Sequence, residues 1–258
     1  MNRLIVSAPF GNYLSFPGVT STIGTYTLKH RAGLLRRIWR VISTVRYSRR
    51  NQAWVNRLGL PNPGITSVTP EMASGKILSI HGFSELEWMS LADTCCQLLP
   101  LAVELNLSCP NVTAASMADL GRQVRRAVPF LLSREIPVIV KLPPVRWMDL
   151  ALPLFEHGCR IFHCCNTIPT PAGGMSGKPL KQFSLWAIHD LRVRFHSNIM
   201  IIGGGGVTCE QDARDYLDAG ADHVAIGSML LNPFNWRKVK GILKAASGEA
   251  VDLQVTLL

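Results

Sequence analysis

The chain has 258 residues, 47% of them hydrophobic, and a formal net charge of +10 at pH 7. This length and composition suffice for one large core, so we expect a single domain over residues 1–258. No run of eighteen apolar residues occurs and the N-terminus lacks a signal-peptide pattern, which predicts a cytoplasmic protein without a spanning helix. Seven cysteines with no CxxC pair argue against a disulfide framework and a zinc site.

Short apolar runs alternate with amphipathic stretches along most of the chain. This alternation predicts parallel strands joined by helices, and eight such strands in this length predict an α/β fold, a closed (β/α)8 TIM barrel. The predicted strands are Leu4–Ser7, Ser21–Leu28, Lys76–Ile80, Ala102–Leu107, Val138–Leu142, Arg160–Cys165, Ile199–Ile202 and His223–Ile226. The predicted helices are Ser84–Leu99, Ala114–Leu132, Asp149–His157, Lys181–Phe195, Cys209–Ala219 and Phe234–Ala246.

A strongly basic segment follows the second predicted strand. Residues 1–70 hold ten Lys or Arg and no Asp or Glu, and the densest part, residues 29–50, predicts a basic amphipathic helix. One interpretation is an extra barrel helix with a solvated cationic face. The other is a surface for an anionic membrane, a quinone pool or an acidic redox partner. Nucleic acid is not an expected partner, because no clear aromatic interleaving or known RNA-binding motif accompanies the charge.

The octet Glu104-Leu-Asn-Leu-Ser-Cys-Pro-Asn111 combines a strand end with a polar turn. Pro110 stops the strand, so the turn should lie at the C-terminal edge of the barrel, where barrel enzymes carry their chemistry. Cys109 is the candidate catalytic base. A free thiol has a pKa near ~8.5, so it needs nearby N–H groups or positive charge to act at neutral pH.

Other polar residues also stand at strand ends. Lys141 ends an apolar strand, where its ammonium would stabilise developing negative charge or, alternatively, extend to solvent at the rim. Asn106, Asn111 and Asn166 offer paired donors and acceptors suited to a planar imide or a carboxylate. A lone Asn at such a place is more often a turn former, but these three should converge on one rim.

Glycine-rich turns follow the last two predicted strands. Gly203–Gly206 and Gly227-Ser228 are predicted to bind phosphate, because glycines let backbone N–H groups approach an anion closely and these loops are the usual phosphate site of such barrels. The alternative is a pair of tight turns with no ligand. A third cluster, residues 173–177, would close over the same group.

These motifs resemble those of the dihydroorotate dehydrogenases, flavin enzymes of pyrimidine synthesis. The octet is similar to the family signature in which the cysteine is the catalytic base, and residues 56–64, Asn-Arg-Leu-Gly-Leu-Pro-Asn-Pro-Gly, resemble the substrate loop. The resemblance implies catalytic roles for Cys109 and Lys141 and substrate binding by Asn56, Asn106, Asn111, Asn166 and Thr167. It implies FMN binding by Ala8, Asn106, Lys141, Gly177, Gly205, Gly206, Gly227 and Ser228.

The resemblance also implies an activity and a setting. Dihydroorotate would be oxidised to orotate, with Cys109 taking a proton from C5 while hydride passes from C6 to flavin N5. The chain is closer to the soluble, cysteine-using class, and the resemblance implies a homodimer. We expect it in the cytoplasm, with the basic segment as a surface for peripheral contact with a membrane or a redox partner. The electron acceptor stays open between fumarate, a nicotinamide through an iron–sulfur partner, and quinone.

One departure affects these expectations. Where the family carries a lysine after the second strand, this chain has Gly24, so Arg57 or another basic residue of the N-terminal segment would have to replace it.

Two other functions compete with the leading one. The first is a tRNA-dihydrouridine synthase-like flavoenzyme, although no RNA-binding helical domain is expected after the last strand. The second is a flavin-binding or electron-transfer protein that lost dehydrogenase activity with the change to Gly24.

Overall fold

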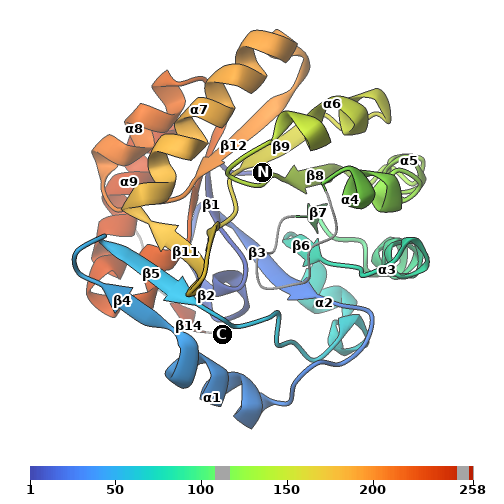
Figure 1. The fold of residues 1–258 in the computed structure, drawn as a ribbon, viewed down its shortest axis with the longest axis horizontal. Helices are drawn as coiled ribbons and strands as arrows, with labels where there is room; N and C mark the ends of the chain where they lie inside the picture. Colours follow the sequence, from blue (N-terminus) through green and yellow to red (C-terminus); the bar gives the residue numbers. More distant parts are fainter. Residues whose placement is uncertain (108–116, 249–255, 258) are drawn as a thin grey trace.

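The computed structural model describes residues 1–107, 117–248 and 256–257. Its centre is a closed barrel of parallel strands in the order β1-β13-β12-β9-β8-β7-β6-β3, which confirms the predicted (β/α)8 barrel (Figure 1). Each predicted strand overlaps one barrel strand. Their bounds are β1 Leu4–Val6, β3 Val19–Tyr26, β6 Ile77–Ile80, β7 Ala102–Asn106, β8 Val138–Lys141, β9 Ile161–Cys164, β12 Met200–Gly204 and β13 His223–Ile226.

Helices surround the barrel, and α1 projects from its periphery (Figure 1). Each helix after β6 buries an apolar stripe, as Trp88, Leu91 and Cys95 do on α3. The helices are α1 Leu34–Thr44, α2 Pro70–Ala73, α3 Glu85–Leu98, α4 Met117–Val124, α5 Ala127–Leu132, α6 Met148–Glu156, α7 Lys178–Phe195, α8 Glu210–Asp218 and α9 Val239–Ser247. Short 3₁₀ turns lie at η1 Phe10–Asn12, η2 Ile65–Ser67, η3 His196–Asn198, η4 Ser228–Leu231 and η5 Pro233–Lys238.

Two predicted helices are interrupted. The helix expected over Ala114–Leu132 is divided into α4 and α5, and residues 114–116 lie outside the described part of the chain. Pro129 explains the division, because its ring would clash with the carbonyl of residue 125 in a continuous helix. The helix expected over Phe234–Ala246 begins instead as η5, whose first turn Asn232 caps by accepting a hydrogen bond from the Phe234 N–H.

The helix expected over residues 29–50 is wrong in extent. Only α1 is helical, and the chain then forms β4 Arg46–Ser48 and β5 Ala53–Asn56. These strands join β10 Ile168–Thr170 and β11 Gly173–Gly177 in a small antiparallel sheet of order β10-β11-β5-β4. Tyr47 and Trp54 lie opposite each other, with ring centroids 5.0 Å apart, and such aromatic pairs stabilise short strands. The remaining pair, β2 Leu14–Ser15 with β14 Thr256–Leu257, is also antiparallel.

The barrel interior changes from apolar to polar along the strand axis. A lower layer contains only apolar side chains. Side chains of one strand face the same way at every second residue, so Ser79, Glu104 and His163 form the next layer, each two positions after an apolar partner. The lower layer consists of Ile5, Ile77, Ala102, Ile139, Ile161, Ile202 and Ala225.

Glu104 is 1% exposed and is surrounded by donors. Ser79 Oγ donates to its Oε1 at 2.9 Å, and His163 Nδ1 lies 2.7 Å from its Oε2. Lys141 Nζ lies 3.9 Å from Oε1. Burial raises the pKa of Glu104, but the Lys141 ammonium and the hydrogen bonds from His163 and Ser79 outweigh it and lower the pKa to about 2. The carboxylate is therefore charged inside the barrel.

His163 is neutral beside this carboxylate. Burial and the Lys141 ammonium lower its pKa from 6.5, and they outweigh the opposite effect of Glu104. Nδ1–H therefore donates to the carboxylate. Because the unfolded His163 binds a proton more readily, this residue costs stability as the pH falls below 6.5.

Replacing Glu104 by Gln removes the buried charge and keeps an acceptor for Ser79. We expect the free energy of unfolding at pH 7 to fall by about 3 kcal/mol, the scale for breaking a buried ion pair. Because the folded pKa of about 2 lies below the unfolded 4.5, the contribution of Glu104 is fully present above pH 4.5 and is lost toward pH 2. Urea titrations of both proteins over this range measure the difference.

The matched control is Glu156→Gln on α6, where the side chain is exposed. Its free energy of unfolding should change by less than about 0.5 kcal/mol. If the gap between the wild type and Glu104→Gln does not shrink below pH 4.5, Glu104 is not charged in the folded protein.

Candidate active site

A cavity of 940 Å³ opens at the C-terminal ends of the barrel strands. Its size lies within the range of about 300–1,000 Å³ that is usual for ligand pockets. Part of the wall comes from strand ends and part from the segment that carries α1 and the loop after β5. Six residues selected from the sequence meet there: Ala8, Asn56, Asn106, Lys141, Asn166 and Thr167.

A chain of hydrogen bonds holds the two central carboxamides. Asn166 Nδ2 donates to Asn106 Oδ1 at 2.9 Å, and Asn106 Nδ2 donates to Thr25 Oγ1 at 2.9 Å. Thr25 Oγ1 lies 3.0 Å from Ser79 Oγ, which contacts Glu104. The hydrogen-bond chain that starts at the Glu104 carboxylate therefore fixes the orientation of both carboxamides.

Lys141 is the cation at the floor of the cavity. Its side chain is 9% exposed, at the end of β8, and its ammonium faces the Glu104 carboxylate. The alternative interpretation, a lysine extending into solvent at the rim, is thus wrong. A cation held at this depth can stabilise negative charge on a ligand more strongly than one in water.

The glycine loops lie beside this cavity rather than in its wall. Gly177, Gly205 and Gly206 have φ of +119°, +108° and +74°, values that other residues rarely adopt. A Cβ on Gly206 would lie 2.7 Å from the Gly177 carbonyl oxygen. Gly227, followed by Ser228 at the start of η4, lies beside Ser7 and Phe10. Gly206 and Gly177 thus pack backbone against backbone, whereas Gly205 lies against the Leu180 side chain.

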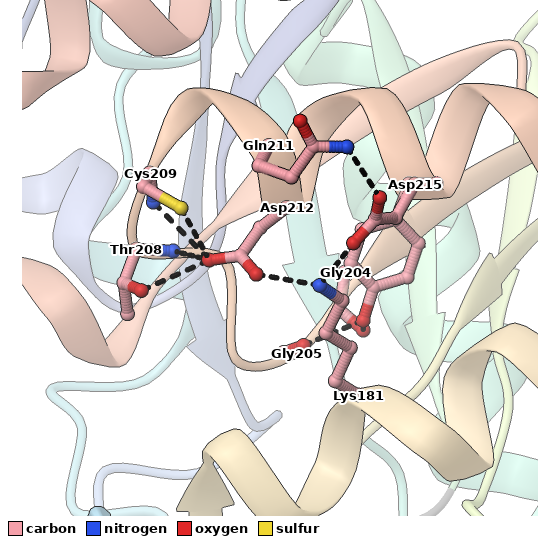
Figure 2. Close-up of polar contacts among 9 residues, drawn as sticks. Lys181, Gly204, Gly205, Thr208, Cys209, Gln211, Asp212 and Asp215 are labelled. Carbon is pink, nitrogen blue, oxygen red and sulfur yellow. Dashed lines mark hydrogen bonds and ion pairs between the residues drawn. The ribbon is translucent and has the colours of Figure 1, made fainter.

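A side-chain network below these loops was not predicted from the sequence. Tyr216 donates its hydroxyl to the carbonyl oxygens of Gly205 at 2.5 Å and Gly204 at 3.2 Å. Figure 2 shows the Asp212 carboxylate between Thr208, whose N–H donates to it at 2.8 Å, and Lys181, whose Nζ donates at 2.6 Å. The spacing of Asp212 and Tyr216, one helical turn apart directly after a glycine loop, is the signal that indicates such an anchor.

Lys181 forms ion pairs with two carboxylates, those of Asp212 and Asp215. Lys181 also contacts the Asp215 carboxylate at 2.5 Å. Burial lowers the pKa of Lys181, but its hydrogen bonds to Asp212 and Asp215 outweigh burial and raise it. The lysine is therefore charged, and it connects α7 to α8 beneath the loop.

The position of the missing lysine cannot hold a side chain in this backbone. Gly24 has φ of +104°, and a Cβ there would lie 2.3 Å from the Ser79 carbonyl oxygen. The Asn12 carboxamide contacts both peptide groups of Gly24, accepting from its N–H at 3.2 Å and donating to its carbonyl at 3.0 Å.

Arg57 does not take the place of that lysine. Its guanidinium donates to the carbonyl oxygens of Ala172 at 3.0 Å and Pro171 at 2.5 Å, which fastens the loop after β10. Arg37 of α1 lines the cavity instead, and its Nε is buried without a hydrogen-bond partner. Of the basic residues in 1–70, Arg37 is the one that lines the cavity.

Cys109 and Asn111 lie outside the described residues. The described part of their motif ends at Leu107, directly after Asn106 in the cavity wall. Among the residues that the structure describes, no three His, Cys, Asp or Glu side chains gather as a metal site.

Comparisons with known proteins agree with this geometry. The family profile of dihydroorotate dehydrogenase matches residues 158–246. Dihydroorotate dehydrogenase A (fumarate) of Limosilactobacillus reuteri is 33% identical over 207 residues, which cover 68% of this chain and 66% of the relative. The catalytic subunit of dihydroorotate dehydrogenase B (NAD(+)) of Listeria welshimeri is 30% identical over 221 residues, or 74% of this chain and 71% of the relative.

A solved structure shares the fold. The dihydroorotate dehydrogenase of Eimeria tenella in complex with ferulenol superposes with a TM-score of 0.75 at 18% identity, over 93% of this chain and 80% of that one. The matched region spans slightly less than two thirds of the Limosilactobacillus relative and more than two thirds of the Listeria one. On these sequence matches, the chain belongs to the dihydroorotate dehydrogenase family.

Proposed function

We propose that this protein is an FMN-dependent dihydroorotate dehydrogenase that oxidises dihydroorotate to orotate in pyrimidine synthesis. The observation that carries the proposal is the convergence of Asn106, Asn166 and Lys141 in one cavity, beside glycine loops in the family's positions. Two relatives, whose matches cover 68% and 74% of this chain, are named as dihydroorotate dehydrogenases. The proposal places the reaction in the cytoplasm and the protein in a homodimer.

The described residues fit FMN. Gly177, Gly205 and Gly206 carry no side chain to cover their backbone N–H groups, which would suit close approach of a phosphate. Gly227 and Ser228 supply the neighbouring loop, and Ala8 lies at the cavity wall. Lys141 would stabilise negative charge on the flavin ring. When bound, FMN would supply the hydride acceptor at N5.

The protein groups would act on the substrate in two ways. Cys109, as thiolate, would remove the C5 proton while hydride leaves C6, so that the new double bond forms between these carbons. Asn56, Asn106, Asn166 and Thr167, with Asn111, would bind the imide and carboxylate of the planar pyrimidine through paired donors and acceptors. The carboxamides of Asn106 and Asn166 are already oriented by the Thr25–Ser79 chain, so substrate binding need not reorder them.

The proposal also includes a basic group near the substrate, Arg37. Arg37 would supply the positive charge that the family places on the lysine at the position of Gly24. Its unpaired buried Nε supports a role toward an anionic ligand group. The electron acceptor stays open between fumarate, a nicotinamide through a partner, and quinone.

Anaerobic stopped-flow absorbance tests the activity. Dihydroorotate should bleach the oxidised-flavin band of the wild type, whereas Cys109→Ala should keep its flavin and be reduced about 10²–10⁴-fold more slowly, the usual contribution of a general base. Cys96→Ala on α3 is the matched control and should react as the wild type does. A yellow wild-type protein that dihydroorotate does not bleach would favour a flavin-binding protein without this activity, and unaltered reduction of Cys109→Ala would remove the thiol from the mechanism.

Gly206→Ala tests the cofactor site separately. A Cβ there meets the Gly177 carbonyl oxygen, and φ of +74° is strained for alanine, at a cost on the order of 1–3 kcal/mol. The purified variant should therefore retain about tenfold less FMN, measured as the ratio of flavin to protein absorbance. Gly33→Ala is the control, because an added Cβ there meets nothing within 4 Å. Full flavin content in Gly206→Ala would contradict this cofactor site.

A further inference from the structure

Helix α1 carries its apolar side chains toward solvent. None of its residues is buried: Leu35 is 83% exposed, Trp39 67% and Ile42 64%. At 100° per residue, Leu34, Leu35, Ile38, Trp39, Val41 and Ile42 form one continuous arc, and Arg36, Arg37, Arg40, Ser43 and Thr44 form the other.

The polar arc of α1 faces the protein. Arg40 donates from Nη1 to the Leu58 carbonyl oxygen at 2.6 Å, and Arg37 reaches the cavity wall. A helix packed on a core normally buries its apolar arc and solvates its polar one, so α1 is reversed. The interpretation of α1 as an extra barrel helix with a solvated cationic face is therefore wrong, and its apolar arc lacks a partner among the described residues.

The surroundings of this arc are cationic. Residues 1–70 contain no Asp or Glu. Directly after α1, the strand β4 and its turn add Arg46, Tyr47 and Arg49, all exposed. Arg46 donates to the Ile42 carbonyl oxygen at 2.8 Å, which holds this arginine against the end of the helix. Exposed apolar and cationic side chains thus lie together on α1 and the strand that follows it. Figure 1 shows α1 at the periphery of the barrel.

We propose that α1 docks the protein on the surface of an anionic lipid bilayer. The apolar arc, with Leu35, Trp39 and Ile42 at its centre, would lie among the acyl chains near the headgroups, while Arg36, Arg46 and Arg49 contact lipid phosphates. Among the described residues, no helix is long and apolar enough to cross a membrane. Since Arg37 and Val41 of the same helix line the cavity, docking would place the cavity close to the membrane surface.

Charge favours a bilayer over a second copy of the chain. A two-fold contact through α1 would bring the same arginines of both copies together, with no acidic residue in 1–70 to offset them. An anionic bilayer offers phosphates and an apolar layer in one plane, which matches both arcs of the helix.

Flotation with vesicles tests the proposal on the purified full-length protein. Vesicles of phosphatidylcholine and phosphatidylglycerol in equal parts should carry the wild type, and those of phosphatidylcholine alone should carry about tenfold less, with added salt weakening the binding. Leu35→Gln/Trp39→Gln should lose binding at least about tenfold. These side chains are exposed, so the substitutions should leave folding unchanged. Leu86→Gln/Trp186→Gln is the matched control, at exposed apolar positions on α3 and α7.

Each other outcome overturns the proposal. Binding lost in Arg36→Gln/Arg49→Gln but kept in the Leu35/Trp39 variant would indicate charge attraction without docking of the apolar arc. Absence of vesicle binding, with a sedimenting dimer that the Leu35/Trp39 variant converts to monomer, would assign α1 to a second copy. Absence of both would leave α1 without a lipid role. None of these readouts uses dehydrogenase activity, so the test does not depend on the proposed reaction.

Discussion

A carboxylate that is ionised inside a barrel needs compensating charge, and Glu104 obtains it from Lys141 while Ser79 and His163 satisfy its remaining lone pairs. This requirement links four neighbouring barrel strands, β6, β7, β8 and β9, at the same height. It holds Lys141 in place at the floor of the cavity, where an unpaired lysine would extend into solvent. It also orients Ser79, whose hydroxyl continues through Thr25 to the carboxamides of Asn106 and Asn166. The charge of Glu104, one layer below the carboxamides, thus sets the orientation of the polar groups in the cavity wall.

Close backbone packing is the second constraint. Gly206 lies against Gly177, and Tyr216 binds the carbonyl oxygens of Gly204 and Gly205 from the opposite side. These contacts hold the glycine loop from two sides. Close packing also excludes a side chain at Gly24, where a Cβ would lie 2.3 Å from the Ser79 carbonyl oxygen. Arg37, from an element outside the barrel, lines the cavity together with Lys76 and Lys141.

The segment between β3 and β6 therefore differs most from a plain barrel. It adds α1 and two strands that pair with β10 and β11, so that loops after β3 and β9 become one sheet at the edge of the cavity. Arg57 strengthens this sheet by binding the carbonyl oxygens of Pro171 and Ala172. Helix α1 therefore has two contacts: Arg37 and Val41 line the cavity, and its apolar arc faces solvent.

The sequence by itself determined the barrel, because each buried strand is a short apolar run and the helices between them have a period of 3.6 residues. It also identified the strand-end residues that meet in the cavity, since parallel strands end at the same rim. Only the tertiary structure decided what depends on contacts between distant segments. The partners of Glu104, the presence of Arg37 rather than Arg57 in the cavity wall, and the support of the glycine loop by Tyr216 and Lys181 are of this kind. The reversed orientation of α1 is too, because a periodic pattern shows that a helix has two faces but not which of them the rest of the protein covers.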